Sequence, residues 1–251
     1  MATVSAPTTT PLVRLEGVRK EFGAVVALER VDLDVNAGEI VALVGDNGAG
    51  KSTLIKIVAG VHEPTAGRVV LDGAPVRLAN PNDSRRHGIE VVFQDLALAD
   101  NQPVYMNMFL GRELVRGPLR RLDRAGMARE TGELLDELDI RVPSPRVNIR
   151  ALSGGQRQGV AIARATHWGE RLILMDEPTA ALGVQETARV EETILRMKER
   201  GKAILIVSHS LDQVFRISDR ICVLRRGRQV GVKTTAETNG DEIVSMITGL
   251  R

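Results

Sequence analysis

A glycine-rich stretch near the start of the chain has the residue types and spacing of a phosphate-binding loop. The stretch GDNGAGKST contains the pattern G-x-x-x-x-G-K-[ST]. It follows the apolar run EIVALV and precedes an apolar helical pattern, the context that makes this motif specific. Amides at a helix start bind phosphate oxygens, helped by the helix dipole. We therefore expect a nucleotide site formed by Gly45, Asp46, Asn47, Gly48, Ala49, Gly50, Lys51, Ser52 and Thr53.

Two side chains of this loop carry chemistry of their own. Lys51 is expected to reach the β- and γ-phosphates, and the Ser52 hydroxyl is expected to bind Mg²⁺. The alternative is a glycine-rich turn with a chance Lys-Ser pair. The strand before the loop and the helix after it disfavour that alternative.

Two adjacent carboxylates end the apolar run RLILMDE. A parallel sheet brings the carboxyl ends of its strands to one edge, where ligands bind. We expect Asp176 to hold Mg²⁺, either as a direct ligand or through another ligand of the ion. We expect Glu177 to orient and polarise an attacking water. Taken alone, such a pair is more often a solvated turn, but the phosphate loop favours the catalytic interpretation.

A second glycine turn, LSGGQ, follows later in the chain, although the phosphate loop is already complete. Its residues precede or begin the predicted helix GQRQGVAIARA. A helix start presents free amides and the positive end of the dipole. We therefore expect an anion at the turn made by Leu152, Ser153, Gly154, Gly155 and Gln156.

In this order, GDNGAGKST, LSGGQ and LILMDE resemble the motifs of an ABC-type ATPase cassette. The resemblance covers nearly all of the chain after Leu12 and is specific against kinases and GTPases. It implies an ATP-hydrolysing enzyme with ATP and Mg²⁺ as cofactors. It also implies that LSGGQ completes the ATP site of a second cassette, arranged head to tail.

The same resemblance assigns three further residues and shows one departure. Gln94 matches the glutamine that senses Mg²⁺ and the γ-phosphate, His209 the histidine that contacts the γ-phosphate beside Glu177, and Phe22 the aromatic that stacks on adenine. The alternatives are a polar strand end, a structural histidine and a core aromatic. Gly183 stands where the family commonly has an aspartate in its subunit-contacting loop, which bears on communication between the two sites.

The pattern of elements predicts an α/β fold, a P-loop NTPase core whose mostly parallel sheet is flanked by helices. Strands at 13–22 and 27–35 indicate an antiparallel β subdomain at the N-terminus, and a hairpin is expected to turn at Asp72 and Gly73. Further strands are expected at 39–45, 89–94, 171–176, 203–209 and 220–226, with a helix ending at Gly60 and others between the later strands.

Residues of about 95–165 have the pattern of an inserted helical subdomain. Its main helix, 123–138, places Met127, Leu134, Leu135 and Leu138 on one side. We expect one ATPase domain over 13–251. Residues 1–12, which are rich in Thr and Pro, are expected to form a mobile tail.

Composition limits the other classes of function open to this chain. The net charge of +2 and the 2% of aromatic residues are weak features for a nucleic-acid binder, so no nucleic acid is expected. The apolar runs are too short to cross a bilayer. Cys222, within ICVL, is expected to be a buried apolar residue, and Trp168 is expected to pack.

The sequence leaves two interpretations for the surface that would contact a partner. The apolar segment NQPVYMNMFLGRE fits either a groove for a partner's helix or the insertion's own core. Together with EPTAALGVQE and MITGL, it resembles the ATPase of bacterial monosaccharide importers of the ribose, fructose and xylose class. That resemblance implies a homodimer under membrane permease subunits, served by an external sugar-binding protein, with the chain cytoplasmic and peripheral on the membrane.

Two other classes of function stay open. One is a soluble ABC ATPase that acts on nucleic acid or the ribosome, which would usually show coiled coils, two cassettes or basic arms. The other is a nucleotide-gated scaffold without hydrolysis, which would lack the Glu177 and His209 pair.

Overall fold

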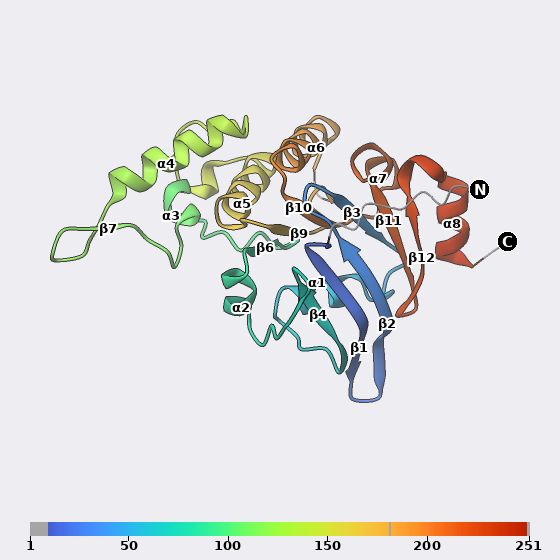
Figure 1. The fold of residues 1–251 in the computed structure, drawn as a ribbon. Coiled ribbons are helices and arrows are strands. Elements are labelled where there is room, and N and C mark those ends of the chain that lie inside the picture. Colours follow the sequence, from blue (N-terminus) through green and yellow to red (C-terminus); the bar gives the residue numbers. More distant parts are fainter. Residues whose placement is uncertain (1–9, 181, 250–251) are drawn as a thin grey trace.

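A ten-stranded sheet runs through the molecule (Figure 1). The computed structural model describes residues 10–180 and 182–249, so most of the predicted mobile tail, residues 1–12, lies outside the described residues. In the order of the sheet, the strands are β5 (Ala74–Val76), β4 (Ala66–Leu71), β1 (Val13–Phe22), β2 (Val25–Val35), β12 (Arg228–Thr234), β11 (Arg220–Arg225), β3 (Ile40–Val44), β10 (Ala203–Val207), β9 (Leu172–Asp176) and β6 (Ile89–Val92).

The strands β11, β3, β10, β9 and β6 run parallel to one another. Every residue of β3 and β10 is buried. Strands covered on both faces need apolar residues on both, which is why these two lack a polar alternation. The predicted mostly parallel core is confirmed.

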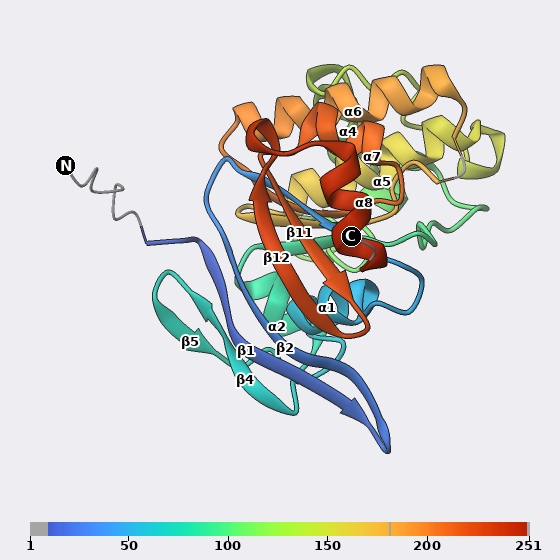
Figure 2. The same ribbon diagram turned by 90° about the vertical axis from the view of Figure 1, so that its right-hand side faces the viewer.

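The N-terminal strands form the predicted antiparallel part of the sheet. Strand β1 pairs with β2 and β4, and β4 pairs with β5 (Figure 2). The β4–β5 hairpin turns at Asp72 and Gly73, whose φ angles of 49° and 79° are both positive. Two-residue hairpin loops favour this left-handed backbone because it matches the twist of the strands.

Helices cover both faces of the parallel strands. They are α1 (Lys51–Val58), α2 (Pro81–Arg86), α5 (Gly154–Trp168), α6 (Val184–Glu199), α7 (Leu211–Ile217) and α8 (Gly240–Thr248). Alternate residues of β3 enter separate cores: Val41 and Leu43 pack in the core that contains α1, whereas Ala42 packs in the core that contains α5, α6 and α7. This alternation follows from the two-residue period of a strand.

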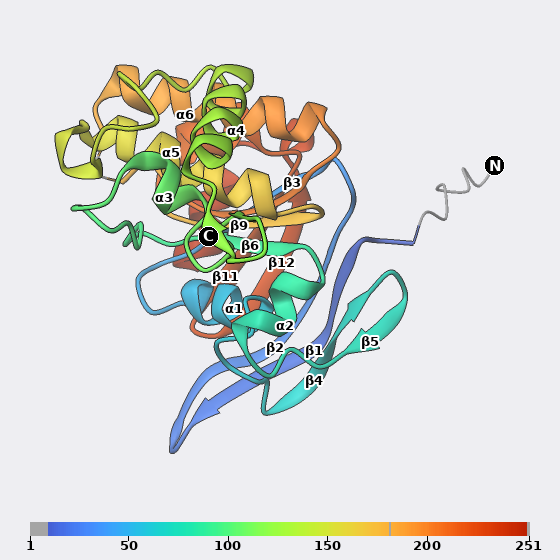
Figure 3. The same ribbon diagram turned by 90° about the vertical axis from the view of Figure 1, so that its left-hand side faces the viewer.

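The insertion lies at one end of the sheet, beyond β6 (Figure 1), and Figure 3 views the molecule from that side. It comprises α3 (Val104–Met108), α4 (Arg124–Glu137) and a short 3₁₀ helix (Ile149–Ala151), and it packs on α5. The predicted face of α4 is buried, with Met127, Leu135 and Leu138 in the apolar core of the insertion. A two-stranded hairpin, β7 (Val115–Arg116) and β8 (Arg121–Leu122), was not predicted, because its residues are all exposed and carry no apolar alternation.

The segment NQPVYMNMFLGRE mostly packs inside the insertion. Tyr105, Met108 and Phe109 are buried in its core, and of the apolar residues in the segment only Leu110 is largely exposed. Trp168 packs as expected: its indole N–H donates to the Met108 carbonyl at 2.8 Å and its ring meets Phe109 edge to face. Of the two sequence interpretations, the internal core therefore accounts for most of this segment.

Two further expectations concern single features. No helix among the described residues combines the length and the apolar character that crossing a membrane requires. Cys222 is buried, and burial raises the pKa of its thiol to about 12. The thiol therefore stays protonated and acts as an apolar residue.

The phosphate loop starts where the chain that leaves β3 lies against the backbone of β11. Gly45 has φ of 152°, and a Cβ at this position would lie 2.1 Å from the Leu224 carbonyl oxygen of β11. Only glycine allows this approach of the two backbones.

We predict that Gly45→Ala destabilises the ligand-free protein through this clash. The expected fall in melting temperature is roughly 5–10 °C for a loss of about 3 kcal/mol. Gly17→Ala is the matched control: Gly17 also has a positive φ, of 57°, but a Cβ there would have open space. Thermal unfolding followed by circular dichroism measures both, and equal shifts would contradict the prediction.

Candidate functional site

The predicted phosphate loop joins β3 to α1, as its sequence context requires. Gly50 caps α1 with a left-handed backbone, φ 103°, and a Cβ there would lie 2.8 Å from the Ala27 carbonyl oxygen. Lys51 is buried, and its ammonium donates to the carbonyl oxygens of Gly45 and Asp46 at 2.7 and 2.9 Å. The cation is therefore held by the carbonyl oxygens at the start of the loop.

Two effects shift the pKa of Lys51 in opposite directions. Burial lowers the pKa of the Lys51 ammonium, whereas the carboxylates of Glu177, Asp176 and Asp46 raise it. The desolvation cost of a buried cation is thus offset in part by acidic neighbours. A phosphate ligand would add further negative charge at this position and favour the charged ammonium.

Asp176 ends β9 beside the phosphate loop. The Ser52 hydroxyl lies 3.4 Å from its carboxylate, as a weak hydrogen bond. Burial raises the pKa of Asp176; Glu177 raises it further, whereas the Ser52 contact and the nearby lysines lower it. Ser52 and Asp176 therefore present oxygen atoms side by side at the start of α1.

Glu177 and His209 meet at the same edge of the sheet. Asp176 pairs with Val207 across β9 and β10, so the residues that follow each strand emerge together. The Nε2 atom of His209 lies 2.7 Å from a carboxylate oxygen of Glu177. Glu177 has φ of 52°, a strained conformation for a residue other than glycine, and its amide donates to the Val207 carbonyl.

A cavity of about 280 Å³ brings these groups together. It is lined by Ala27, Asn47, Gly48, Ala49, Gly50, Lys51, Ser52, Thr53, Glu177 and His209. A cation, a hydroxyl, backbone amides, a carboxylate and an imidazole thus face one space. That set can bind a phosphate chain and orient a water molecule against it.

Five residues predicted for the ATP site do not line this cavity: Gly45, Asp46 and Asp176 lie within two residues of ones that do, whereas Gln94 and Phe22 stand on other elements. Gln94 is exposed and lies two residues beyond the end of β6, which pairs with β9. Phe22 ends β1 and is 44% exposed; its ring meets His62 edge to face and lies under the Lys20 ammonium. The core-packing alternative for Phe22 does not fit this exposure, and the assigned roles of both residues stay predictions.

The LSGGQ turn begins α5, as predicted. Ser153 caps the helix: its hydroxyl accepts from the Gln156 amide at 3.3 Å, and the Gln156 side chain accepts from the Ser153 amide at 3.0 Å. Leu152 is buried in the core of the insertion. Gly154 and Gly155 then follow as the first residues of the helix.

The turn faces a cavity of its own, of about 280 Å³, lined by Ser153, Gly155 and Gln156 together with residues of α6. This cavity shares no lining residue with the one at the phosphate loop. The Glu186 carboxylate of α6 lies beside Gly155 and accepts from the Gly183 amide at 3.2 Å. The two predicted anion sites are therefore separate within one chain.

A match to a family model decides the broader class. The model described as ABC transporter matches residues 28–180, more than half of the chain. The chain belongs to the ABC transporter family. The phosphate loop, the Asp176–Glu177 pair and LSGGQ of this ABC cassette all lie within the matched residues.

Curated relatives of this cassette match over nearly its whole length. The xylose/arabinose import ATP-binding protein of Sulfolobus acidocaldarius is 47% identical over 237 residues, which is 94% of each chain. The fructose import ATP-binding protein of Rhizobium meliloti is 42% identical and covers 96% of this chain and 95% of its own. A ribose import ATP-binding protein of Yersinia pestis is 42% identical, but the match spans only 46% of its length.

Solved ABC cassettes have the same fold. One in its ADP conformation superposes with a TM-score of 0.81, 26% identity and 96% coverage of both chains. A bacterial ABC transporter cassette in dimeric form superposes with a TM-score of 0.75 and 26% identity, covering 89% of this chain and 98% of its own.

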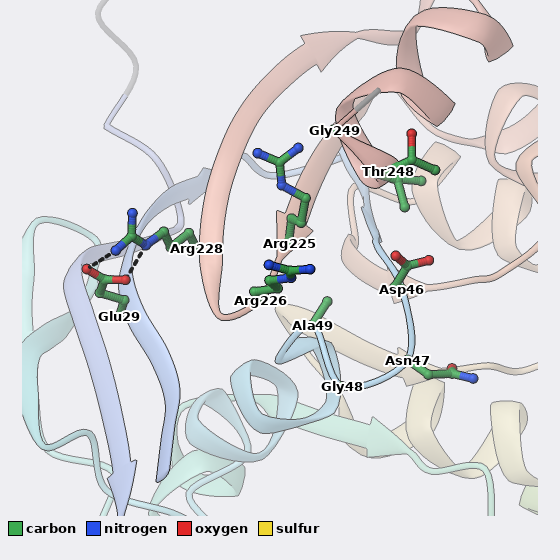
Figure 4. Close-up of a pocket in the computed structure, with 11 residues that line it drawn as sticks. Glu29, Asp46, Asn47, Gly48, Ala49, Arg225, Arg226, Arg228, Thr248 and Gly249 are labelled. Atoms are coloured by element: carbon green, nitrogen blue, oxygen red, sulfur yellow. Dashed lines mark hydrogen bonds and ion pairs between the residues drawn. The ribbon is translucent and has the colours of Figure 1, made fainter. Parts of the chain in front are cut away.

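Sequence reasoning missed a larger cavity beside the phosphate loop of the cassette. It measures about 710 Å³ and lies between residues 46–49, the β11–β12 turn and the end of α8 (Figure 4). Arg225, Arg226 and Arg228 line it, and Arg228 forms an ion pair with Glu29. The arginines come from a turn without a motif, so only the approach of that turn to the loop reveals the cavity.

We predict that Glu177→Gln lowers ATP turnover by on the order of 10² to 10⁴ while ATP affinity stays within about twofold. The amide keeps the shape of the side chain but loses the charge that orients water. Steady-state phosphate release and binding of a fluorescent ATP analogue measure the two quantities. Glu237→Gln, on an exposed residue that does not line the cavity, is the control, and unchanged turnover in Glu177→Gln would contradict the assignment.

Proposed function

We propose that this chain is the ATP-binding and ATP-hydrolysing subunit that powers import of a monosaccharide through a membrane permease. The observation that carries the proposal is the identity of 42–47% to xylose/arabinose and fructose import ATP-binding proteins over nearly the whole chain. The phosphate-loop cavity with its Glu177–His209 pair supports hydrolysis by the same chain.

In this proposal, the cavity residues divide the work of hydrolysis. The loop amides and Lys51 neutralise the β- and γ-phosphates, and Glu177 orients the attacking water. His209, at hydrogen-bonding distance from Glu177, holds that carboxylate and contacts the γ-phosphate. Most of the rate enhancement then comes from positioning and from charge stabilisation.

Ser52 and Asp176 fit a magnesium ion that arrives with ATP. Magnesium in such sites uses few protein ligands and keeps waters and phosphate oxygens. The described residues contain no group of three or more His, Cys, Asp or Glu side chains that could hold a metal alone. The oxygen atoms of Ser52 and Asp176, 3.4 Å apart, suit the shared type of site. We assign Gln94 as a further magnesium-sensing residue and Phe22 as the adenine-stacking residue.

The LSGGQ turn, in this proposal, acts on the ATP of a second copy. Leu152 is buried and fixes the turn to the insertion, while Ser153, Gly154, Gly155 and Gln156 form the helix start that meets the γ-phosphate. The separate cavities of the turn and the phosphate loop support an arrangement between chains. The similarity to a cassette solved as a dimer supports a homodimer.

The remaining parts of the proposed assembly come from the relatives. A sugar import ATP-binding protein needs a permease, so the proposed dimer sits under membrane permease subunits on the cytoplasmic side, as a peripheral protein. An external sugar-binding protein would deliver the substrate. The rival function, a soluble ABC ATPase that acts on nucleic acid or the ribosome, finds no support among these relatives.

The transport prediction uses permease reconstituted in vesicles with this chain and the sugar-binding protein. ATP-dependent uptake of one labelled sugar from a panel of ribose, xylose, arabinose and fructose is expected, and Lys51→Ala should abolish it. Lys233→Ala removes only a surface ion pair with Glu242 and is the control. Absence of uptake, together with ATPase stimulation by nucleic acid or ribosomes, would favour the rival function.

The mixed-dimer prediction tests the action of LSGGQ between chains. Ser153→Arg blocks the γ-phosphate position, and Lys51→Ala disables the phosphate loop, so each protein alone should be nearly inactive. A mixed dimer has one site with both parts intact. An equal mixture should regain up to about a quarter of the wild-type rate, because about half of the dimers are mixed and each has one good site.

This measurement needs the permease, which holds the two copies together, and a different affinity tag on each variant. Purification through both tags in turn isolates the mixed dimers. If these dimers show no activity above either parent, the proposed arrangement between chains is wrong or both sites must act together.

A further inference from the structure

A buried polar network lies behind the Glu177–His209 pair. Its centre is Gln213 of α7, which has no exposed surface. The Gln213 side-chain oxygen accepts from the Ser208 hydroxyl at 2.8 Å and from the Thr179 hydroxyl at 3.2 Å. Its side-chain nitrogen donates to Glu191 of α6 at 3.4 Å. One amide therefore joins four segments of the chain.

Two of these segments carry the catalytic pair. Ser208 directly precedes His209, and Thr179 follows Glu177 by two residues. The Ser208 hydroxyl also accepts a hydrogen bond from the Ser210 amide at 3.1 Å, so the two residues that flank His209 are linked to each other. Gln213 thus holds the chain just before the imidazole and just after the carboxylate.

The far side of the network is anchored by an ion pair. Glu191 is buried and accepts two hydrogen bonds from the Arg216 guanidinium, at 2.9 and 2.7 Å. This bidentate pairing fixes the Glu191 carboxylate in place. The carboxylate in turn fixes which side of the Gln213 amide carries the donor.

The chemistry of the position requires both a donor and an acceptor. An apolar side chain of similar volume would fill the space but leave the Ser208 and Thr179 hydroxyls and a Glu191 carboxylate oxygen with fewer partners. Such unsatisfied groups carry a desolvation cost, and neighbouring loops shift to relieve it. The loops that would shift here are those of Glu177 and His209.

We propose that Gln213 is a positioning residue for ATP hydrolysis: by holding the segments around Ser208 and Thr179, it sets the approach of His209 to Glu177. The inference rests on the catalytic roles proposed for that pair. Gln213 touches neither ATP nor the reacting atoms, so its effect acts through the geometry of the pair alone.

Gln213→Glu gives the sharpest test because it keeps the shape of the side chain. An ionised carboxylate still accepts from both hydroxyls but repels Glu191, whereas a protonated one reproduces all three contacts. The titratable and charged groups near the position are Glu191 and, behind it, Arg216 on the helix side, with Glu177 and His209 on the segments that carry the two hydroxyls. The like charge of Glu191 raises the pKa of the introduced carboxyl.

The expected result is a kcat about tenfold below wild type at pH 8 that recovers to within about threefold at pH 6, at an unchanged KM for ATP. Each rate is divided by the wild-type rate at the same pH. Gln229→Glu is the control: Gln229 only accepts, from the Asp32 amide, so a carboxylate serves equally and the ratio should stay flat. A Gln213→Glu ratio that does not change with pH, or a change in KM alone, overturns the proposal.

A second set of variants tests the proposal if Gln213→Glu fails to fold. Thr179→Val and Ser208→Ala each remove one hydroxyl donor, and each should lower kcat by about threefold to tenfold without a change in KM. Thermal unfolding shows that each variant is folded before its rate is used. If Glu177→Gln abolishes turnover while folded Thr179, Ser208 and Gln213 variants keep the wild-type kcat, the positioning role is wrong and the catalytic assignment stands. If Glu177→Gln keeps full turnover, the proposed function itself fails.

Discussion

The parallel register of β10 against its two neighbours is the constraint on which the site depends. Val207 pairs with Asp176 of β9 on one side and with Leu43 of β3 on the other. The three strands therefore end level, and the phosphate loop, the two carboxylates and His209 leave the sheet at one edge. A slip of one residue would exchange the apolar side chains between the two cores of the sheet. Because both faces are buried, packing fixes the register, and the register fixes the distances between the groups proposed for catalysis.

The same edge keeps several unfavourable groups in the ligand-free molecule. Burial lowers the pKa of Lys51 and raises that of Asp176, so both charged forms are disfavoured by their surroundings. Glu177 holds a left-handed backbone that costs about 1–3 kcal/mol. A phosphate beside Lys51 would favour the charged ammonium, and a cation beside Asp176 would favour the charged carboxylate. The stability given up at this edge is therefore of the kind that binding of ATP with its metal restores, and functional sites commonly show this exchange.

Sequence reasoning found the features that depend on local spacing. The phosphate loop, the Asp176–Glu177 pair and the LSGGQ helix start each need only a strand end or a helix start, which periodicity predicts well. It left two interpretations for the apolar segment around Met108 because a short helix has too few turns to define a face, and contacts with α4 decide between them. It missed the role proposed for Gln213, because its partners Ser208, Thr179 and Glu191 lie on three segments that meet there only after folding. Gln94 and Phe22 are exposed, and their assigned roles depend on a bound ligand.

The insertion and the core are joined by the helix that carries LSGGQ. Helix α5 starts at the signature turn, and three turns later Arg164 donates to the carbonyl oxygens of Leu96 and Ala97, at 2.8 and 3.0 Å. Burial lowers the pKa of Arg164, yet its guanidinium donates to backbone carbonyls and not to a carboxylate. The segment that follows Gln94 is therefore tied to the same rigid helix as Ser153. In the proposed dimer, a movement of α5 would therefore carry that segment with it, which links the residue proposed to sense the metal to the signature turn within one chain.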